Sequence, residues 1–154
     1  MVNNPREACP YELQDHGGGR RHWRRHAVHD AAEMEAMIED VVGELSGAGF
    51  GRKETFAVRL ALEEAVVNAI KHGHHNDPSR TVRVRYHVTP TCVLAEVEDE
   101  GPGFRPEDVP DPRRPENLER DSGRGLLLMR SYMTWVRYNE TGNRVTLCKR
   151  HTAS

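Results

Sequence analysis

The chain has 154 residues, of which 36% are hydrophobic, and a formal net charge of -2 at pH 7. This length favours one domain with its own core, and the balanced charge gives no electrostatic case for binding nucleic acid in bulk. No apolar run approaches the roughly 20 residues that a membrane span needs, and the N-terminus lacks the apolar core of a secretory signal.

The number and spacing of the cysteines favour one cellular compartment over another. Cys9, Cys92 and Cys148 are odd in number and show no Cys-x-x-Cys spacing. This pattern argues for reduced thiols in a cytoplasm, and against a disulfide framework or a zinc site.

The N-terminal region divides into a tail and a basic stretch. Residues 1–20 predict a disordered tail, because prolines and glycines accompany few apolar side chains. The stretch 20–26 has two interpretations. One is a patch for nucleic acid or an acidic partner, and the favoured one is an edge strand with Trp23 inward and solvated arginines. We therefore expect one domain over residues 21–151.

Two helices are expected next. Asp30 is a good helix cap, and apolar residues recur after it at helical spacing until Gly47 and Gly49 end the helix. Residues 53–71 predict a longer helix that is apolar on more than one side, and we therefore expect it to be buried.

Strands, a lid and a closing hairpin complete the chain. Alternating residues predict strands at 81–88 and 92–98, after a turn marked by Asp77 and Pro78. Residues 104–122, rich in proline and charge, predict a loop that could form a lid over a ligand. A short helix and a two-stranded hairpin follow, at 126–133, 135–139 and 144–149. This order predicts an α+β two-layer sandwich, a mixed and mostly antiparallel sheet with helices on one face.

The long helix carries the first candidate motif. Glu64 and Asn68 lie four residues apart and share one helix face, and an acid and an amide in an apolar helix need partners. We favour a binding site over a solvated stripe, and interpret Glu63 as a surface residue. Lys71 suits a phosphate contact and an exposed helix end equally well. The histidines at 72, 74 and 75 are interpreted as a solvated turn rather than a metal site.

Two glycine-containing motifs follow. Asp99 ends a strand before Gly101 and Gly103, where a carboxylate can accept a hydrogen bond from an adenine amino group. Gly123 and Gly125 precede a helix, whose first N–H groups favour an anion. Each motif alone would be better explained as an ordinary turn or helix start.

The ordered set Leu62–Gly73, Glu98–Gly103 and Ser122–Leu126 resembles the nucleotide-binding motifs of the GHKL, or Bergerat, family, which includes DNA gyrase B and sensor histidine kinases. It is most similar to the anti-sigma-factor branch, small serine/threonine kinases that phosphorylate a partner protein, the anti-sigma antagonist. The resemblance covers roughly residues 22–150.

The resemblance implies a kinase that binds ATP and Mg²⁺. Asn68 would hold the metal, Glu64 would be the general base, and Asp99 would contact adenine. The other residues expected at the nucleotide are Lys71, His72, Gly101, Gly103, Gly123, Arg124, Gly125, Leu126 and Asn143. Many relatives have Gly-Thr where this chain has Gly142-Asn143, which leaves the contact of Asn143 open.

The implied partners are a STAS-type anti-sigma antagonist and a sigma factor, and relatives commonly form homodimers. Two alternatives stay open: a nucleotide-gated binding switch without phosphotransfer, and a detached histidine-kinase-type catalytic domain. Glu64 mildly favours catalysis, since a pure binder has less need of a base. Direct nucleic-acid binding through the arginines at 20–25 is the weakest alternative, and no membrane partner is expected.

Overall fold

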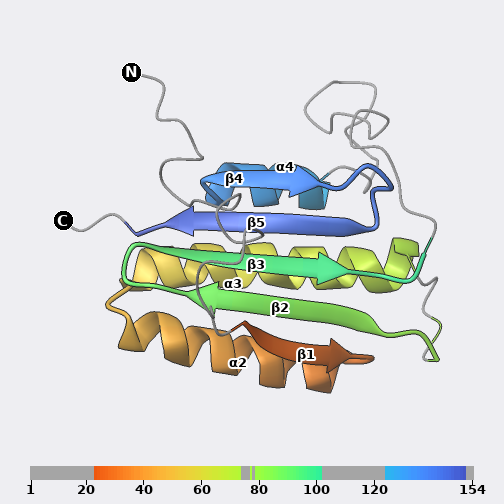
Figure 1. The fold of residues 1–154 in the computed structure, drawn as a ribbon, viewed down its shortest axis with the longest axis horizontal. Helices are drawn as coiled ribbons and strands as arrows, with labels where there is room; N and C mark the ends of the chain where they lie inside the picture. Colours follow the sequence, from red (N-terminus) through yellow and green to blue (C-terminus); the bar gives the residue numbers. More distant parts are fainter. Residues whose placement is uncertain (1–22, 74–76, 78, 102–123, 152–154) are drawn as a thin grey trace.

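The computed structural model describes residues 23–73, 77, 79–101 and 124–151 (Figure 1). The expected tail at 1–20 and the expected lid at 104–122 lie outside these residues. The described elements are β1 (Arg24–Val28), α2 (Ala31–Gly47), α3 (Arg52–Asn68), η2 (Ala69–Gly73, a π-helical turn), β2 (Val82–Val88), β3 (Cys92–Glu98), α4 (Arg124–Tyr132), β4 (Trp135–Tyr138) and β5 (Arg144–Arg150).

The five strands form one sheet in the order β1-β2-β3-β5-β4, with the helices packed on one face (Figure 1). The expected α+β two-layer sandwich is confirmed. All four strand pairings among the described residues are antiparallel, so the expectation of a mixed sheet is wrong in this detail. Short connections join β2 to β3 and β4 to β5, and such hairpins make antiparallel neighbours.

The core lies between the helices and the inner face of the sheet. Alternate residues of the strands point toward the helices, as the sequence alternation predicts. Each fully buried aliphatic side chain contributes about 1.5–3 kcal/mol. The largest buried core side chains are Met37, Ile38, Val41 and Leu45 from α2, Val58, Leu62 and Val66 from α3, and Val28, Tyr86, Met129 and Leu147 from β1, β2, α4 and β5.

The helix ends follow the sequence closely. The Asp30 carboxylate accepts a hydrogen bond from the backbone N–H of Glu33 at 2.8 Å, which confirms the expected cap of α2. Beyond the other end of α2, Gly49 has φ +91°, a left-handed conformation that favours glycine. The helix α3 differs from its expectation, because Phe56 is 57% exposed and stacks edge-on against Tyr132 of α4.

The strand β1 lies at the edge of the described sheet, as expected. Trp23, just before it, is half-buried, and the guanidinium of Arg85 lies 4.4 Å from the centre of its ring. Arg24 is exposed, but its Nε donates to the Glu44 carboxylate at 3.1 Å. The described part of the basic stretch, from residue 23 onward, therefore leads into an edge strand in which Arg24 is paired.

The outer face of the sheet carries a second, smaller cluster of buried residues. Cys92 and Leu94 of β3 and Cys148 of β5 are buried there, with Trp23 and Trp135 packed against them. Cys148 is disulfide-bonded, so the expectation that all three thiols are reduced is wrong. Among the described residues, we find no helix with the length and apolar character that crossing a bilayer requires.

Candidate functional site

Four segments that carry predicted site residues meet at one end of the molecule. The C-terminal ends of α3 and β3, the start of α4 and the β4–β5 connection all lie toward the right of Figure 1. The helix α3 contacts α4, β3 and β5, so the helical and the sheet segments at this end belong to one packed unit.

The acid–amide pair lies on the last turns of α3. Glu64 and Asn68 are both half-buried, and Asn68 is the final residue of the α-helix. The chain then widens into the π-helical turn η2, a distortion that is frequent at functional sites. The neighbouring Glu63, interpreted from the sequence as a surface or capping residue, is 29% exposed and pairs with Arg59 at 3.0 Å.

Gly125, the second residue of α4, packs directly on this pair. A Cβ atom at Gly125 would lie 2.8 Å from Asn68 Nδ2 and 2.9 Å from Glu64 Oε2. Cβ atoms do not approach heavy atoms this closely, so only glycine leaves both polar side chains in place. Leu126, the next residue, is 7% exposed and belongs to the hydrophobic core, which anchors the start of α4.

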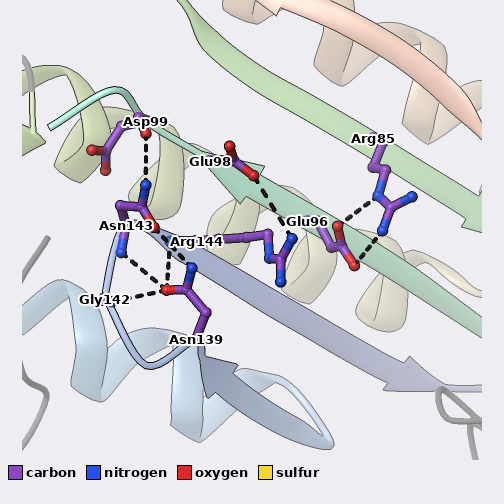
Figure 2. Close-up of polar contacts among 8 residues, drawn as sticks. All are labelled: Arg85, Glu96, Glu98, Asp99, Asn139, Gly142, Asn143 and Arg144. Carbon is purple, nitrogen blue, oxygen red and sulfur yellow. Dashed lines mark hydrogen bonds and ion pairs between the residues drawn. The ribbon is translucent and has the colours of Figure 1, made fainter. Parts of the chain in front are cut away.

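Asp99 and Asn143 are joined where β3 ends and β5 begins (Figure 2). The backbone N–H of Asp99 donates to the carbonyl of Asn143 at 2.9 Å, and Asn143 Nδ2 donates to the Asp99 carbonyl at 3.3 Å. One Asp99 carboxylate oxygen accepts the N–H of Gly101 at 2.7 Å. Asp99, the predicted adenine contact, and Asn143, whose contact was left open, are thus neighbours.

Asn139, the residue after β4, forms several hydrogen bonds that hold the β4–β5 connection, a role that the sequence analysis did not predict. Its Oδ1 accepts the N–H groups of Gly142, Asn143 and Arg144 at 2.8, 3.1 and 3.2 Å. Its Nδ2 donates to Asn143 Oδ1 at 2.8 Å (Figure 2). Gly142, three residues after Asn139, has φ +79°, and an asparagine and a glycine in one short connection favour a turn, which could have indicated this role.

Tyr138 is a second neighbour that the sequence reasoning did not identify. Burial raises the pKa of its hydroxyl to about 12; the charge of Arg130 lowers this pKa, and that of Asp99 raises it. The phenol therefore stays protonated at neutral pH and places an uncharged, mostly buried group near Asp99.

The remaining predicted residues are placed less fully. Lys71 is exposed within η2, and His72 follows it in the same turn. Arg124 is the first residue of α4. Gly103 and Gly123 lie outside the described residues, as do His74 and His75.

This arrangement suits a nucleotide and one magnesium ion. Gly125 allows Asn68 and Glu64 to lie against the start of α4, beside the first N–H groups of a helix, which favour phosphate. Asn68 offers one amide oxygen. In the part of the chain that the structure describes, no cluster of three or more His, Cys, Asp or Glu side chains is arranged to hold a metal. One protein ligand is enough for Mg²⁺, which keeps water and binds phosphate oxygens.

Comparison with known proteins agrees with this geometry. Residues 27–149 match the family model of the histidine kinase-like ATPase domain. The chain is 34% identical over 107 residues to the anti-sigma F factor of Geobacillus kaustophilus, covering 65% of this chain and 71% of that one. It is 36% identical over 110 residues to the anti-sigma F factor of Anoxybacillus flavithermus, covering 66% and 73%.

Proposed function

The chain belongs to the histidine kinase-like ATPase domain family, which implies ATP binding, and from this premise we propose that it is an anti-sigma-type serine/threonine kinase using ATP and Mg²⁺. The observation that carries the proposal is the packing of Gly125 against Glu64 and Asn68. It keeps a base and a metal ligand beside the helix N-terminus that suits phosphate.

Each residue then has one role. Asn68 holds the metal through its amide oxygen, and Asp99 accepts a hydrogen bond from the adenine amino group. Glu64 takes the proton from a serine or threonine hydroxyl of the partner. When bound, ATP supplies the phosphoryl group, and Mg²⁺ neutralises charge on the phosphates. Lys71, His72, Arg124 and Asn143 surround the nucleotide, and the glycines at 101, 103, 123 and 125 let the backbone approach it.

The proposed partners rest on similarity to the anti-sigma F factors. Similarity to anti-sigma F factors supports a sigma factor and an anti-sigma antagonist as the proteins that this chain binds, and the antagonist is the proposed phosphoacceptor. A homodimer and a cytoplasmic location belong to the same proposal. The sheet and the helices fix only the ATPase-like fold, and one fold hosts several functions.

The testing experiment is calorimetric titration of ATP, with and without Mg²⁺, into the wild type, Asp99→Asn and Glu140→Gln. Glu140 is an exposed carboxylate of the β4–β5 connection, and its amide variant is the matched charge control. We expect Mg²⁺-dependent binding that Asp99→Asn loses and Glu140→Gln keeps. Absence of binding to folded wild type would overturn the nucleotide site. Binding without phosphate transfer to any antagonist would favour the nucleotide-gated switch.

A further inference from the structure

The outer face of the sheet, which none of the described helices covers, contains a groove of about 520 Å³ next to the edge strand β1. This groove is separate from Glu64 and Asn68, which lie on a helix of the opposite layer. Its side-chain lining is strongly charged and comes from β1, β2, β3 and β5. The charged residues are Arg25, Arg83, Arg85, Arg144, Glu96 and Glu98.

Both glutamates of the groove are already neutralised. Glu96 is 3% exposed and accepts two hydrogen bonds from the guanidinium of Arg85, at 2.6 and 2.9 Å (Figure 2). Glu98 pairs with Arg144 at 3.8 Å. Two-point pairing of a carboxylate with a guanidinium fixes both groups. Arg85 is therefore held by Glu96, whereas Arg144 and Glu98 form a single, exposed ion pair.

Arg25 and Arg83 are the two other arginines that line the groove. Both are exposed, and neither forms an ion pair with any residue that the structure describes. Arg25 lies directly opposite Arg85 in the β1–β2 pairing, and Arg83 lies opposite Glu98 in the β2–β3 pairing. Glu96 already balances the charge of Arg85, so the exposed guanidinium of Arg25 is the group with which an added anion would pair.

We propose that this groove, defined by Arg25, Arg83, Arg85 and Arg144, is a docking site for an acidic segment of a partner protein. Exposed arginines with a planar, multiply donating head suit carboxylates. The strand β1 lines one side of the groove with Arg25, His26 and Ala27, and as the edge strand it leaves that side open to an extended chain.

The groove fits an acidic peptide better than nucleic acid. Two glutamates line it and would oppose an unbroken run of phosphates. The guanidinium of Arg85 lies over the ring of Trp23, and that of Arg137 lies 4.8 Å over the ring of Trp135. One face of each ring is therefore covered by an arginine and is not offered to a base for stacking. The net charge of -2 also gives no long-range attraction for a polyanion.

The test uses the full chain and a fluorescein-labelled peptide of about eight glutamates, which at roughly 3.4 Å per residue is long enough to cross a sheet face. The variant is Arg25→Gln with Arg83→Gln. Its matched control is Arg52→Gln with Lys53→Gln, which removes the same charge from exposed positions at the start of α3. We expect the groove variant to weaken peptide binding about three- to tenfold, and the control to change it by less than about twofold.

Two further probes separate the sources of binding. A glutamine peptide of the same length should not bind, and a single-stranded oligonucleotide of matched charge should bind more weakly than the glutamate peptide. Equal loss in groove variant and control, no binding by the wild type, or tighter binding of the oligonucleotide would each overturn the proposal. If the groove variant does not fold, the wild type is used instead, and the NMR chemical-shift changes of its backbone amides on adding the glutamate peptide locate the binding site. Shifts centred on 25–27 and 83–85 support the groove, and shifts elsewhere overturn it.

Discussion

A Cβ atom added to Gly125 would lie 2.8 Å from the side-chain amide nitrogen of Asn68. The side chain of Asn68 therefore packs closely against the first turn of α4, and this contact is possible only because residue 125 is a glycine. Residues fifty-seven positions apart in the sequence meet here, as the packing of α3 on α4 requires.

Gly125→Ala should separate folding from nucleotide binding. Alanine favours a helix over glycine by about 1 kcal/mol, which offsets part of the cost of moving two flexible side chains. We therefore expect the free energy of unfolding to change by less than about 1 kcal/mol. The affinity for Mg²⁺-ATP should fall, because Asn68 and Glu64 must shift. Thermal unfolding and calorimetry on one preparation measure both quantities.

The control for that substitution is Gly43→Ala. Gly43 lies within α2, and a Cβ there would meet no heavy atom within 4 Å. The same substitution should therefore stabilise the protein by about 0.5–1 kcal/mol and leave ATP affinity unchanged. Unchanged ATP affinity in Gly125→Ala would mean that the contact with Asn68 has no part in binding.

Asn139→Ala should weaken both the hairpin and the nucleotide site. The change removes the acceptor for three backbone N–H groups and the donor to Asn143. We expect a loss of about 1–3 kcal/mol in unfolding free energy, because part-buried groups lose their partners. Asn139→Asp is the informative companion, since it keeps the acceptor and loses only the donor. Asn139→Asp should retain most of the unfolding free energy, but the side chain of Asn143 should no longer be held in place. A lower ATP affinity at near-normal stability would show that the position of Asn143 matters for binding.

The sequence predicted the fold well where local chemistry decides it. The cap at Asp30 and the bounds of β3 match their expectations, because capping and strand alternation are local. The resemblance related Asp99 and Asn143 to the nucleotide, but their direct hydrogen bonds were not predicted. The packing of Gly125 on Asn68, the hub at Asn139 and the exposure of Phe56 were not predicted, because each depends on how distant elements pack.

Arg85→Ala should be strongly destabilising. It would leave Glu96, 3% exposed, without the guanidinium that donates two hydrogen bonds to it. Removing one partner of a buried pair leaves an uncompensated charge, and because Arg85 is itself 34% exposed we expect a loss of about 2–4 kcal/mol rather than the upper range. Chemical denaturation measures this loss.

The double change Arg85→Met with Glu96→Leu is the control for that pair. Replacing both charged groups by apolar ones should restore most of the stability, since no unpaired carboxylate remains. If the single and double variants were equally unstable, packing of the arginine stem on Trp23 would be the dominant contribution instead.

A buried tyrosine, Tyr86, and a half-buried one, Tyr138, predict how stability changes at high pH. The pKa of Tyr138 is raised to about 12, chiefly by burial, and burial followed by the Glu44 carboxylate raises the pKa of Tyr86. A phenol with a folded-state pKa above its unfolded value of about 10 stabilises the protein below that pH. The stability is lost as the pH rises from about 10 toward 12.

Tyr138→Phe should flatten this alkaline loss by an amount on the order of 2–3 kcal/mol, since no phenolate has to form in the interior. Denaturant midpoints at neutral and at alkaline pH, together with phenolate absorbance, measure the effect. Tyr132→Phe is the matched control, because Tyr132 lies on the outer surface of α4 and is 37% exposed. Its alkaline profile should follow the wild type. If Tyr138→Phe lost stability with pH as steeply as the wild type, the phenol of Tyr138 would not govern the alkaline limit. Tyr86, whose buried hydroxyl has no hydrogen-bond partner among the described residues, would then be the residue to change next.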